Sequence, residues 1–306
     1  MQITKDKITE IFYLTDEFCN ECESEIKKHR IENKVQKVRD RKAGLPDSEV
    51  MTILITFHTG GFRNFKHFYI NYVCKHLVGE FPDVVSYSRF VTLQSRCGIP
   101  FMLFVKLHCL GKCTGINYID STPLRVCHNR RILQHKVFTG VAERGHCSMG
   151  WFFGFKLHLI INDKGELMSF YLSKANVDDR NIKVLTSMTE SIFGKLFGDK
   201  GYISKALSEL LFQDGIQLIT KVRKNMKKKP LSNTEKILLR KRAIIETIND
   251  ELKNICQIEH TRHRSINGFL LNILGALAAY SFFPKKPSIN IEMDKSTNNQ
   301  LSLFAA

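Results

Sequence analysis

From residue 115 onward, the sequence alternates short β-rich runs with helical patterns, and this order limits the fold more than any other feature. Three predicted strands come first, and residues 162–165 (Asn-Asp-Lys-Gly) form a hairpin turn between the second and the third. Helices and strands then alternate, which predicts an α/β domain. The predicted strands cover residues 115–120, 151–161, 166–172, 195–199 and 216–222.

The helices between and after these strands complete the order. One helix is expected between the third and fourth strands, another between the fourth and fifth, and two more at the end. This is the order of a ribonuclease-H-like domain, in which helices flank a mixed sheet, so we expect the first and fourth strands to be neighbours. The predicted helices cover residues 179–193, 203–213, 234–256 and 266–283.

The first 110 residues carry helical patterns. Helices are expected at 3–30, from 47 to about 59, at 62–77 and at 86–96, and the apolar residues 100–110 are expected to dock this region onto the rest. Short helices with tight turns fit a helix-turn-helix that binds DNA, and they fit any small helical bundle equally. We expect a helical N-terminal region (1–110), a ribonuclease-H-like domain (111–285) and a disordered C-terminal tail (286–306).

The chain is strongly basic. Lys and Arg outnumber Asp and Glu by 46 to 30, which gives a formal net charge of +16. This excess favours a polyanionic partner, with nucleic acid as the first candidate and an anionic membrane as the second. The N-terminus has no apolar secretory segment, and the longest apolar stretch, 269–283, is too short to span a bilayer. We therefore expect nucleic acid rather than a membrane as the partner, and a cytoplasmic location.

Three acids stand where a metal site would need them. Asp120 ends the first predicted strand, Asp199 ends the fourth, and Glu246 lies in the predicted helix 234–256. Phosphodiester cleavage needs a strong nucleophile and relief of charge at phosphorus, and divalent cations held by carboxylates provide both. Neighbouring first and fourth strands would bring Asp120 and Asp199 together, and the helix would add Glu246.

Longer motifs surround these acids. They are Tyr-Ile-Asp-Ser-Thr-Pro-Leu at 118–124, Gly-Trp-Phe-Phe-Gly-Phe-Lys-Leu-His at 150–158, Ala-Asn-Val-Asp-Asp-Arg at 175–180 and Gly-Asp-Lys-Gly-Tyr at 198–202. Arg242, Glu246 and Lys253 also match the signature Y-x2-R-x3-E-x6-K, with Leu239 in place of the tyrosine. With these motifs the chain resembles the bacterial insertion-sequence transposases of the DDE class, in particular the insertion-sequence 982 family.

The resemblance covers about residues 45–285 and implies both a fold and a chemistry. It implies a ribonuclease-H-like catalytic domain, with Asp120, Asp199 and Glu246 as catalytic residues and as ligands of Mg²⁺ or Mn²⁺, two ions in all. The substrates it implies are the element's own terminal inverted repeats and target DNA. Because two ends must be joined, we expect a homodimer or a larger assembly on DNA, associated with the bacterial nucleoid.

Basic residues near the predicted site are expected to contact DNA. Some follow Asp120 directly, others belong to a run of six cations within residues 221–229, and Lys156 and His158 share one face of a strand. That strand face could flank the phosphate or be an ordinary solvated face. The expected DNA-binding residues are Arg125, Arg130, Arg131, Lys156, His158, Arg223, Lys224, Lys227, Lys228, Arg242 and Lys253.

The acids also have purely structural interpretations. Asp120 could cap a turn, Asp199 could cap the helix 203–213, and Asp178 and Asp179 are expected to cap the helix after them. Asp250 and Glu251 follow Glu246 closely and compete with it by spacing alone. For the whole chain, a DNA-binding regulator without catalysis and a metal-dependent nuclease that cuts without joining remain alternatives.

Overall fold

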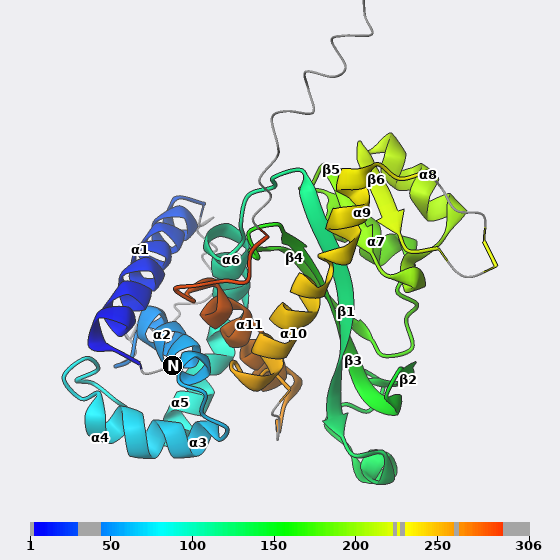
Figure 1. Ribbon diagram of the computed structural model, residues 1–306. Coiled ribbons are helices and arrows are strands. Elements are labelled where there is room, and N and C mark those ends of the chain that lie inside the picture. Colours follow the sequence, from blue (N-terminus) through cyan, green and yellow to red (C-terminus); the bar gives the residue numbers. More distant parts are fainter. Residues whose placement is uncertain (1–2, 30–43, 223–224, 227–229, 260–262, 290–306) are drawn as a thin grey trace, which may run out of the picture.

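The computed structural model describes residues 3–29, 44–222, 225–226, 230–259 and 263–289. A group of helices built from the first part of the chain lies beside a curved mixed sheet, and further helices cover the sheet (Figure 1). The second half is thus of the mixed α/β class that the sequence predicted.

The part of the chain before residue 109 that the structure describes contains helices and turns, as expected. The helix predicted at 62–77 is one continuous run that changes from α to π winding and back. The apolar residues 100–110, expected only to dock, form a helix of their own. The elements are α1 (Lys5–His29), α2 (Asp47–Thr59), α3 (Phe65–Phe68), η1 (Tyr69–Val73), α4 (Cys74–His76), α5 (Tyr87–Gln94), η2 (Ser95–Cys97) and α6 (Gly98–His108).

The sheet has six strands, and its central order is β2-β3-β1-β5-β6. β3 runs antiparallel to β1, β2 and β4, while β5 is parallel to both β1 and β6. The predicted neighbourhood of the first and fourth predicted strands, now β1 and β5, is confirmed. The strands are β1 (Ile116–Cys127), β2 (Glu143–Cys147), β3 (Gly150–Asn162), β4 (Leu167–Lys174), β5 (Gly194–Gly198) and β6 (Ile216–Thr220).

Two expected element lengths were wrong, and one strand was missed. β1 does not end at Asp120 but continues to Cys127, because β3 pairs with it along that whole length. The predicted helix 234–256 is two helices, and the strand β2 was not predicted at all. The helices of this half are α7 (Ile182–Thr189), α8 (Lys205–Gln213), α9 (Asn233–Arg240), α10 (Ala243–Asn254) and α11 (Ile266–Ser281), with short helices η3 (Asn129–Gln134) and η4 (Lys200–Tyr202).

The hairpin between β3 and β4 forms at the predicted residues. The Asn162 side-chain oxygen accepts hydrogen bonds from the backbone of Lys164 at 3.0 Å and of Glu166 at 2.9 Å. Gly165 has φ +74°, and a β-carbon there would lie 1.9 Å from the Pro287 carbonyl oxygen. The turn therefore requires glycine both for its backbone conformation and for space.

Two hydrophobic cores lie on the two faces of the sheet. The smaller one joins α7 and α8 to the sheet through residues such as Ile119 and Leu196. The larger one is continuous from α1 to α11 and includes Tyr118 and Leu157 of the sheet. Because side chains alternate along a strand, Tyr118 and Ile119 point to opposite faces.

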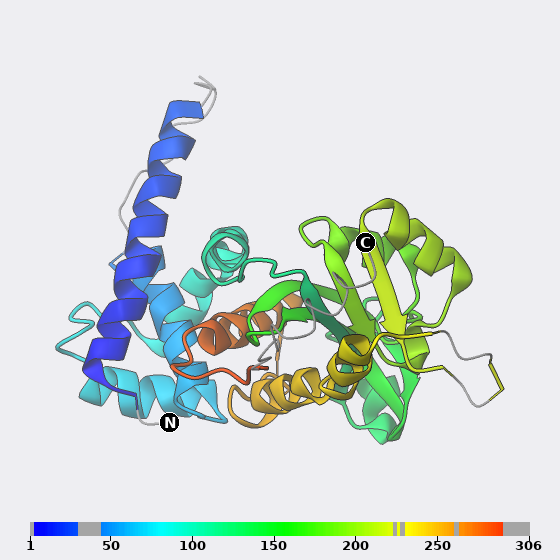
Figure 2. The ribbon, with the colours of Figure 1, turned by 45° about the horizontal axis from the view of Figure 1, so that its top comes forward.

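The helix α11 packs with the N-terminal helices. Figures 1 and 2 both place it beside α2, and Gly275 of α11 is so close to α2 that a β-carbon there would lie 2.8 Å from the His58 ring. On its other side, the Phe269 ring lies 5.0 Å from the Phe155 ring of β3. One core therefore crosses the boundary that we expected at residue 110.

Among the described residues, one helical stretch, Tyr87–His108, is long and apolar enough to cross a membrane by length and composition. It is broken into α5, η2 and α6, and Phe101, Phe104 and Val105 of α6 are completely buried in the larger core. One side of α6 therefore packs into the larger core, while Ile99, Leu103 and Leu107 on the same helix are exposed. Of the tail expected at 286–306, only residues 286–289 belong to the described part of the chain. There the backbone N–H of Ile289 donates a hydrogen bond to the Asp163 carbonyl oxygen at 2.8 Å.

Candidate active site

Asp120 and Asp199 lie next to each other at one end of the β1–β5 pair. The last paired residues of these parallel strands are Tyr118 of β1 and Phe197 of β5. Asp120 follows Tyr118 by two positions, and Asp199 follows Phe197 by two positions. Neighbouring strands are roughly 4.8 Å apart, and residues two positions apart share a face. Both carboxylates therefore project from the same face of the sheet, the face that carries Tyr118 and the larger core.

The Asp120 carboxylate is held by two side chains of the helix region that crosses this face. Asn249 of α10 donates a hydrogen bond to it at 3.1 Å, and a guanidinium nitrogen of Arg242 lies 3.8 Å away. Burial raises the pKa of Asp120 to about 7, against the opposing effect of Arg242, and the charges of Asp199 and Glu246 raise it further. All three acids therefore share one electrostatic environment.

Glu246 joins this environment through Arg242. The Arg242 guanidinium forms an ion pair with Glu246, one helical turn later, while it also faces Asp120. Arg242 is largely buried, with 16% of its side chain exposed, whereas 57% of the Glu246 side chain is exposed. Arg242 therefore links the more buried carboxylate of Asp120 to the more exposed carboxylate of Glu246.

Asp199 has a structural role as well. It directly follows β5, and its side chain accepts a hydrogen bond from the Gly201 backbone at 2.5 Å. This bond caps η4 (Lys200–Tyr202) rather than the helix α8, which Ser204 caps. The turn holds the aspartate at the end of its strand, so capping and a place in the site are compatible.

Three buried polar atoms around the acids have no hydrogen-bond partner among the described residues. They are the Tyr202 hydroxyl, Nη1 of Arg242 and Oδ1 of Asn249. Burial raises the pKa of Tyr202 well above its usual value, and the charges of Asp120, Asp179 and Asp199 add to the effect. Such orphaned groups are uncommon in protein interiors and mark a place that can take further polar partners.

Sequence reasoning missed Asn249 and gave Tyr202 no role of its own. Asn249 lies three residues after Glu246, so both project from one side of α10. That spacing was the available signal for Asn249. Tyr202 stood inside a motif that we used only to locate Asp199, and the burial of its ring was not visible from the sequence.

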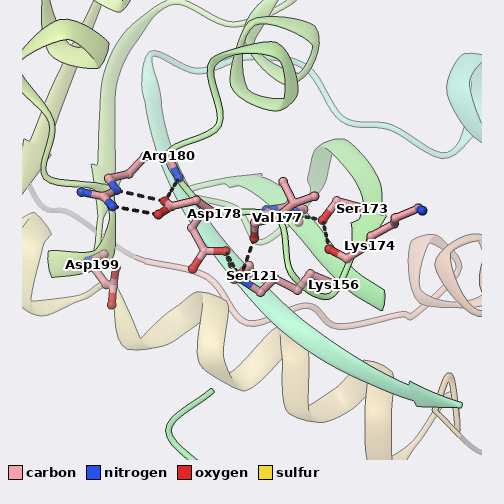
Figure 3. A network of polar contacts seen from close by, with 11 residues as sticks. Ser121, Lys156, Ser173, Lys174, Val177, Asp178, Arg180 and Asp199 are labelled. Carbon is pink, nitrogen blue, oxygen red and sulfur yellow. Dashed lines mark hydrogen bonds and ion pairs between the residues drawn. The ribbon is translucent and has the colours of Figure 1, made fainter. Parts of the chain in front are cut away.

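Lys156 and His158 lie on the other face of the sheet from Asp120. They are paired with Pro123 and Ser121, and these positions alternate with Asp120 along β1. The Lys156 ammonium bonds to Asp179 at 3.1 Å, and Ser121 donates to the same carboxylate at 2.9 Å (Figure 3). The shared strand face of the two residues was predicted correctly, but it does not carry the acids.

His158 is completely buried. Its ring bonds to the Ser173 hydroxyl at 2.8 Å, and burial lowers its pKa to about 4, so the ring is neutral at neutral pH. A side chain without exposed surface has no area for contact with a DNA backbone. His158 is therefore not available for a contact with DNA in this structure.

The two acids before α7 do not cap that helix. Asn181 caps it by accepting a hydrogen bond from the Val184 backbone. Asp178 instead forms an exposed ion pair with Arg180 at 2.7 Å, and the hydrogen bonds from Arg180 lower the Asp178 pKa to about 2 (Figure 3). The capping expectation for Asp178 and Asp179 was wrong because the helix begins three residues later than predicted.

Besides Lys156, His158 and Arg242, the basic residues expected to bind DNA fall into three groups. Arg125, Arg130 and Arg131 are exposed, the first on the extension of β1 and the others on η3. Lys253 donates to the Pro123 carbonyl at 2.9 Å and pairs with Glu259 at 3.3 Å, which ties α10 to β1. The remaining four, Arg223, Lys224, Lys227 and Lys228, lie outside the described residues.

The three acids supply the hard oxygen donors that Mg²⁺ and Mn²⁺ prefer. Asp120 fits such an ion by its environment too, since its partly buried carboxylate lies near two other acids, whose negative charge only Arg242 at 3.8 Å opposes among the described residues. Across the described ranges, however, no three His, Cys, Asp or Glu side chains are close enough to hold one ion. The donor set thus fits a divalent cation, while Arg242 lies between two of the donors.

The fold and this arrangement define a class, the mixed α/β proteins that carry carboxylates on two adjacent central strands, just beyond the point where the pairing of those strands ends. Comparison with protein families narrows the class further. The family model described as a transposase DDE domain matches residues 110–266. The chain belongs to this family of DDE transposases.

Two other comparisons concern the curated proteins and the solved structures. A search of the curated proteins gives no match. Among solved structures, the chain is similar to the piggyBac transposase in a synaptic complex with hairpin DNA, with 10% identity and a TM-score of 0.49, over 91% of this chain and 72% of that one.

Proposed function

We propose that this transposase cuts and joins DNA in a metal-dependent reaction at the ends of its own insertion sequence, with Asp120, Asp199 and Glu246 as the catalytic acids. The observation that carries the proposal is the placement of Asp120 and Asp199 at the same level of two neighbouring strands. The bridge through Arg242 adds Glu246 to the pair.

The finer assignments follow from the strand order and the motifs. When the predicted strands are numbered along the chain, the sheet places them in the order third, second, first, fourth and fifth, which supports a ribonuclease-H-like domain. The motifs around the acids support the insertion-sequence 982 family and a bacterial cytoplasmic setting. DNA is the partner, as terminal inverted repeats and as target, and two protomers act together because two ends are joined.

Mg²⁺ or Mn²⁺, bound by the three acids as two ions, would activate water and neutralise charge on the reacting phosphate. Each residue has its own part in preparing that site. Asp120 must be ionised to bind a cation, and the Asn249 amide orients its carboxylate at 3.1 Å. Arg242 must release one or both acids when they take up cations, and its guanidinium is then free to pair with a DNA phosphate.

The proposed reaction has two steps. Water breaks a phosphodiester bond at the element end and leaves a 3′-hydroxyl. That hydroxyl then attacks a phosphorus atom of the target, where a new P–O bond forms and the bond to the target's own 3′-oxygen breaks. No bond to the protein is needed in either step, and the exposed cations Arg125, Arg130 and Arg131 support the DNA beside the site.

Purified protein incubated with DNA of its own element ends and Mg²⁺ or Mn²⁺ tests the proposal. We expect joined products from the wild type, and DNA binding without products from Asp120→Asn. Asp214→Asn, which changes an exposed aspartate after α8, is the control and keeps full activity. Cutting without joining would favour a nuclease, binding without cutting a regulator, and an active Asp120→Asn variant would remove Asp120 from catalysis.

A further inference from the structure

A cavity of about 1100 Å³ lies between the N-terminal helices and the segment that leads into α11. Residues of α2, α3 and α5 form one side of it, and Glu259 together with residues from the segment 263–272 forms the other. None of the acids of the candidate site lines it, so it is a separate site.

Positive charge lines this cavity. Arg63, Lys66 and Arg264 contribute to its wall and are exposed, and none of them forms an ion pair with another described residue. Ser265 and Gly268, at the N-terminus of α11, also line the cavity. They bring the positive end of the dipole of this sixteen-residue helix to the wall. Glu259, the only acid among the described residues of the wall, is already paired with Lys253. The cavity is therefore suited to phosphate groups.

Aromatic rings form another part of the same wall. Phe65 and Tyr87 are half-buried, with their ring centroids 6.4 Å apart, and the Lys66 ammonium lies 5.8 Å from the Tyr87 ring. Next to α11, His263 is kept neutral by burial, which lowers its pKa to about 4, and its Nε2 has no hydrogen-bond partner among the described residues. Aromatic rings beside cations suit the face of a nucleobase and its neighbouring phosphates.

The cavity is connected to the candidate active site through Glu259. This carboxylate accepts a hydrogen bond from the Arg125 backbone of β1 at 3.1 Å, and it pairs with Lys253 of α10. Lys253 follows Glu246 by seven residues, which is about 10 Å along a helix. A DNA strand leaving the acids along α10 would reach the cavity within a few nucleotides.

We infer that this cavity binds a single DNA strand, with the bases on Phe65 and Tyr87 and the phosphates on Arg63, Lys66 and Arg264. The inference rests on the proposed function in one respect, that DNA is the partner. A duplex would offer its phosphates to the same cations but keeps its base faces stacked inside, so it cannot use the aromatic wall. Unpaired nucleotides use both parts of the wall.

The test is the binding of a fluorescent oligothymidylate and of a labelled duplex to the full chain, without divalent cations. Tyr87→Leu should weaken oligothymidylate binding at least about fivefold and leave duplex binding unchanged. Tyr87→Phe should restore the wild-type affinity, because it keeps the ring. Phe212→Leu on α8, where the ring is 72% exposed, is the matched aromatic control and should change nothing.

Charge reversal gives the second arm. Arg63→Glu and Arg264→Glu should each weaken oligothymidylate binding and flatten its salt dependence, while Lys183→Glu, an exposed change on α7, should not. An unchanged affinity in Tyr87→Leu or in both charge reversals overturns the inference. The cutting assay with Asp120→Asn fails or succeeds independently, so the failure of this inference is distinguishable from the failure of the proposed function.

Discussion

Asp120 and Asp199 stand at the same level of two neighbouring parallel strands, each two positions beyond the last matched pair. Two carboxylates held close together on a rigid sheet repel each other when both are ionised, and this raises the free energy of the ionised site. The burial of Asp120 raises it further. The chemistry of the site and its effect on stability therefore both depend on how this charge is compensated.

The first prediction concerns stability against pH. The pKa of Asp120 is raised from 3.8 to about 7, so folding favours its protonated form. The corresponding stability is fully present below about pH 4 and is lost as the pH rises to about 7, with a slope of at most about 1.4 kcal/mol per pH unit. In metal-free buffer, urea denaturation should show this loss for the wild type relative to Asp120→Asn, and parallel pH profiles would contradict it.

The second prediction concerns Arg242. Its guanidinium contacts both Asp120 and Glu246, so it competes with a divalent cation for the same oxygens. Arg242→Gln should bind Mn²⁺ at lower concentration than the wild type in the absence of DNA, measured by the loss of the free-ion paramagnetic resonance signal. Lys236→Gln, an exposed change on α9, is the control, and an unchanged or weaker affinity in Arg242→Gln would argue against competition.

The third prediction compares two ion pairs on one side of the sheet. Lys156 and Asp179 are 13% and 30% exposed, whereas Arg180 and Asp178 are 43% and 56% exposed. Lys156→Ala should lower the free energy of unfolding by about 2 kcal/mol, because it leaves a shielded carboxylate without its cation. Arg180→Ala should cost no more than about 1 kcal/mol in the same denaturation experiment, and equal losses would contradict the difference in shielding.

The fourth prediction tests the contact between α2 and α11. A β-carbon at Gly275 would lie 2.8 Å from the His58 ring, while one at Gly79 would meet nothing within 4 Å. Gly275→Ala should therefore lower the free energy of unfolding by about 2 kcal/mol through overpacking. Gly79→Ala should change it by less than about 0.5 kcal/mol. A thermal melt of both variants suffices, and a stable Gly275→Ala protein would show that the helices can separate without cost.

The sequence predicted the features that depend on local pattern. Alternating apolar residues located β3 and the hairpin at 162–165, and an acid directly after a β-rich run identified Asp120 and Asp199. The order of the elements then predicted that β1 and β5 are neighbours. The resemblance of the motifs implied which acids belong together, which no spacing could supply, and that grouping stays a prediction.

Features set by distant partners could not be predicted. β1 continues past Asp120 because β3 pairs with it, and nothing in the residues after Asp120 encodes that partner. The break between α9 and α10 falls at Lys241 and Arg242, where no proline or glycine signals it. Strand alternation showed that Lys156 and His158 share a face, but only the sheet as a whole determines which face holds the acids.

The packing of α11 against α2 also determines when folding can finish. Synthesis proceeds from the N-terminus, so α2 leaves the ribosome well before the helix that covers its apolar side has been made. Until then, the His58 ring, which is buried in the finished protein and lies against Gly275 of α11, lacks part of its cover. The helices at the start of the polypeptide thus reach their final packing only after α11 has been translated.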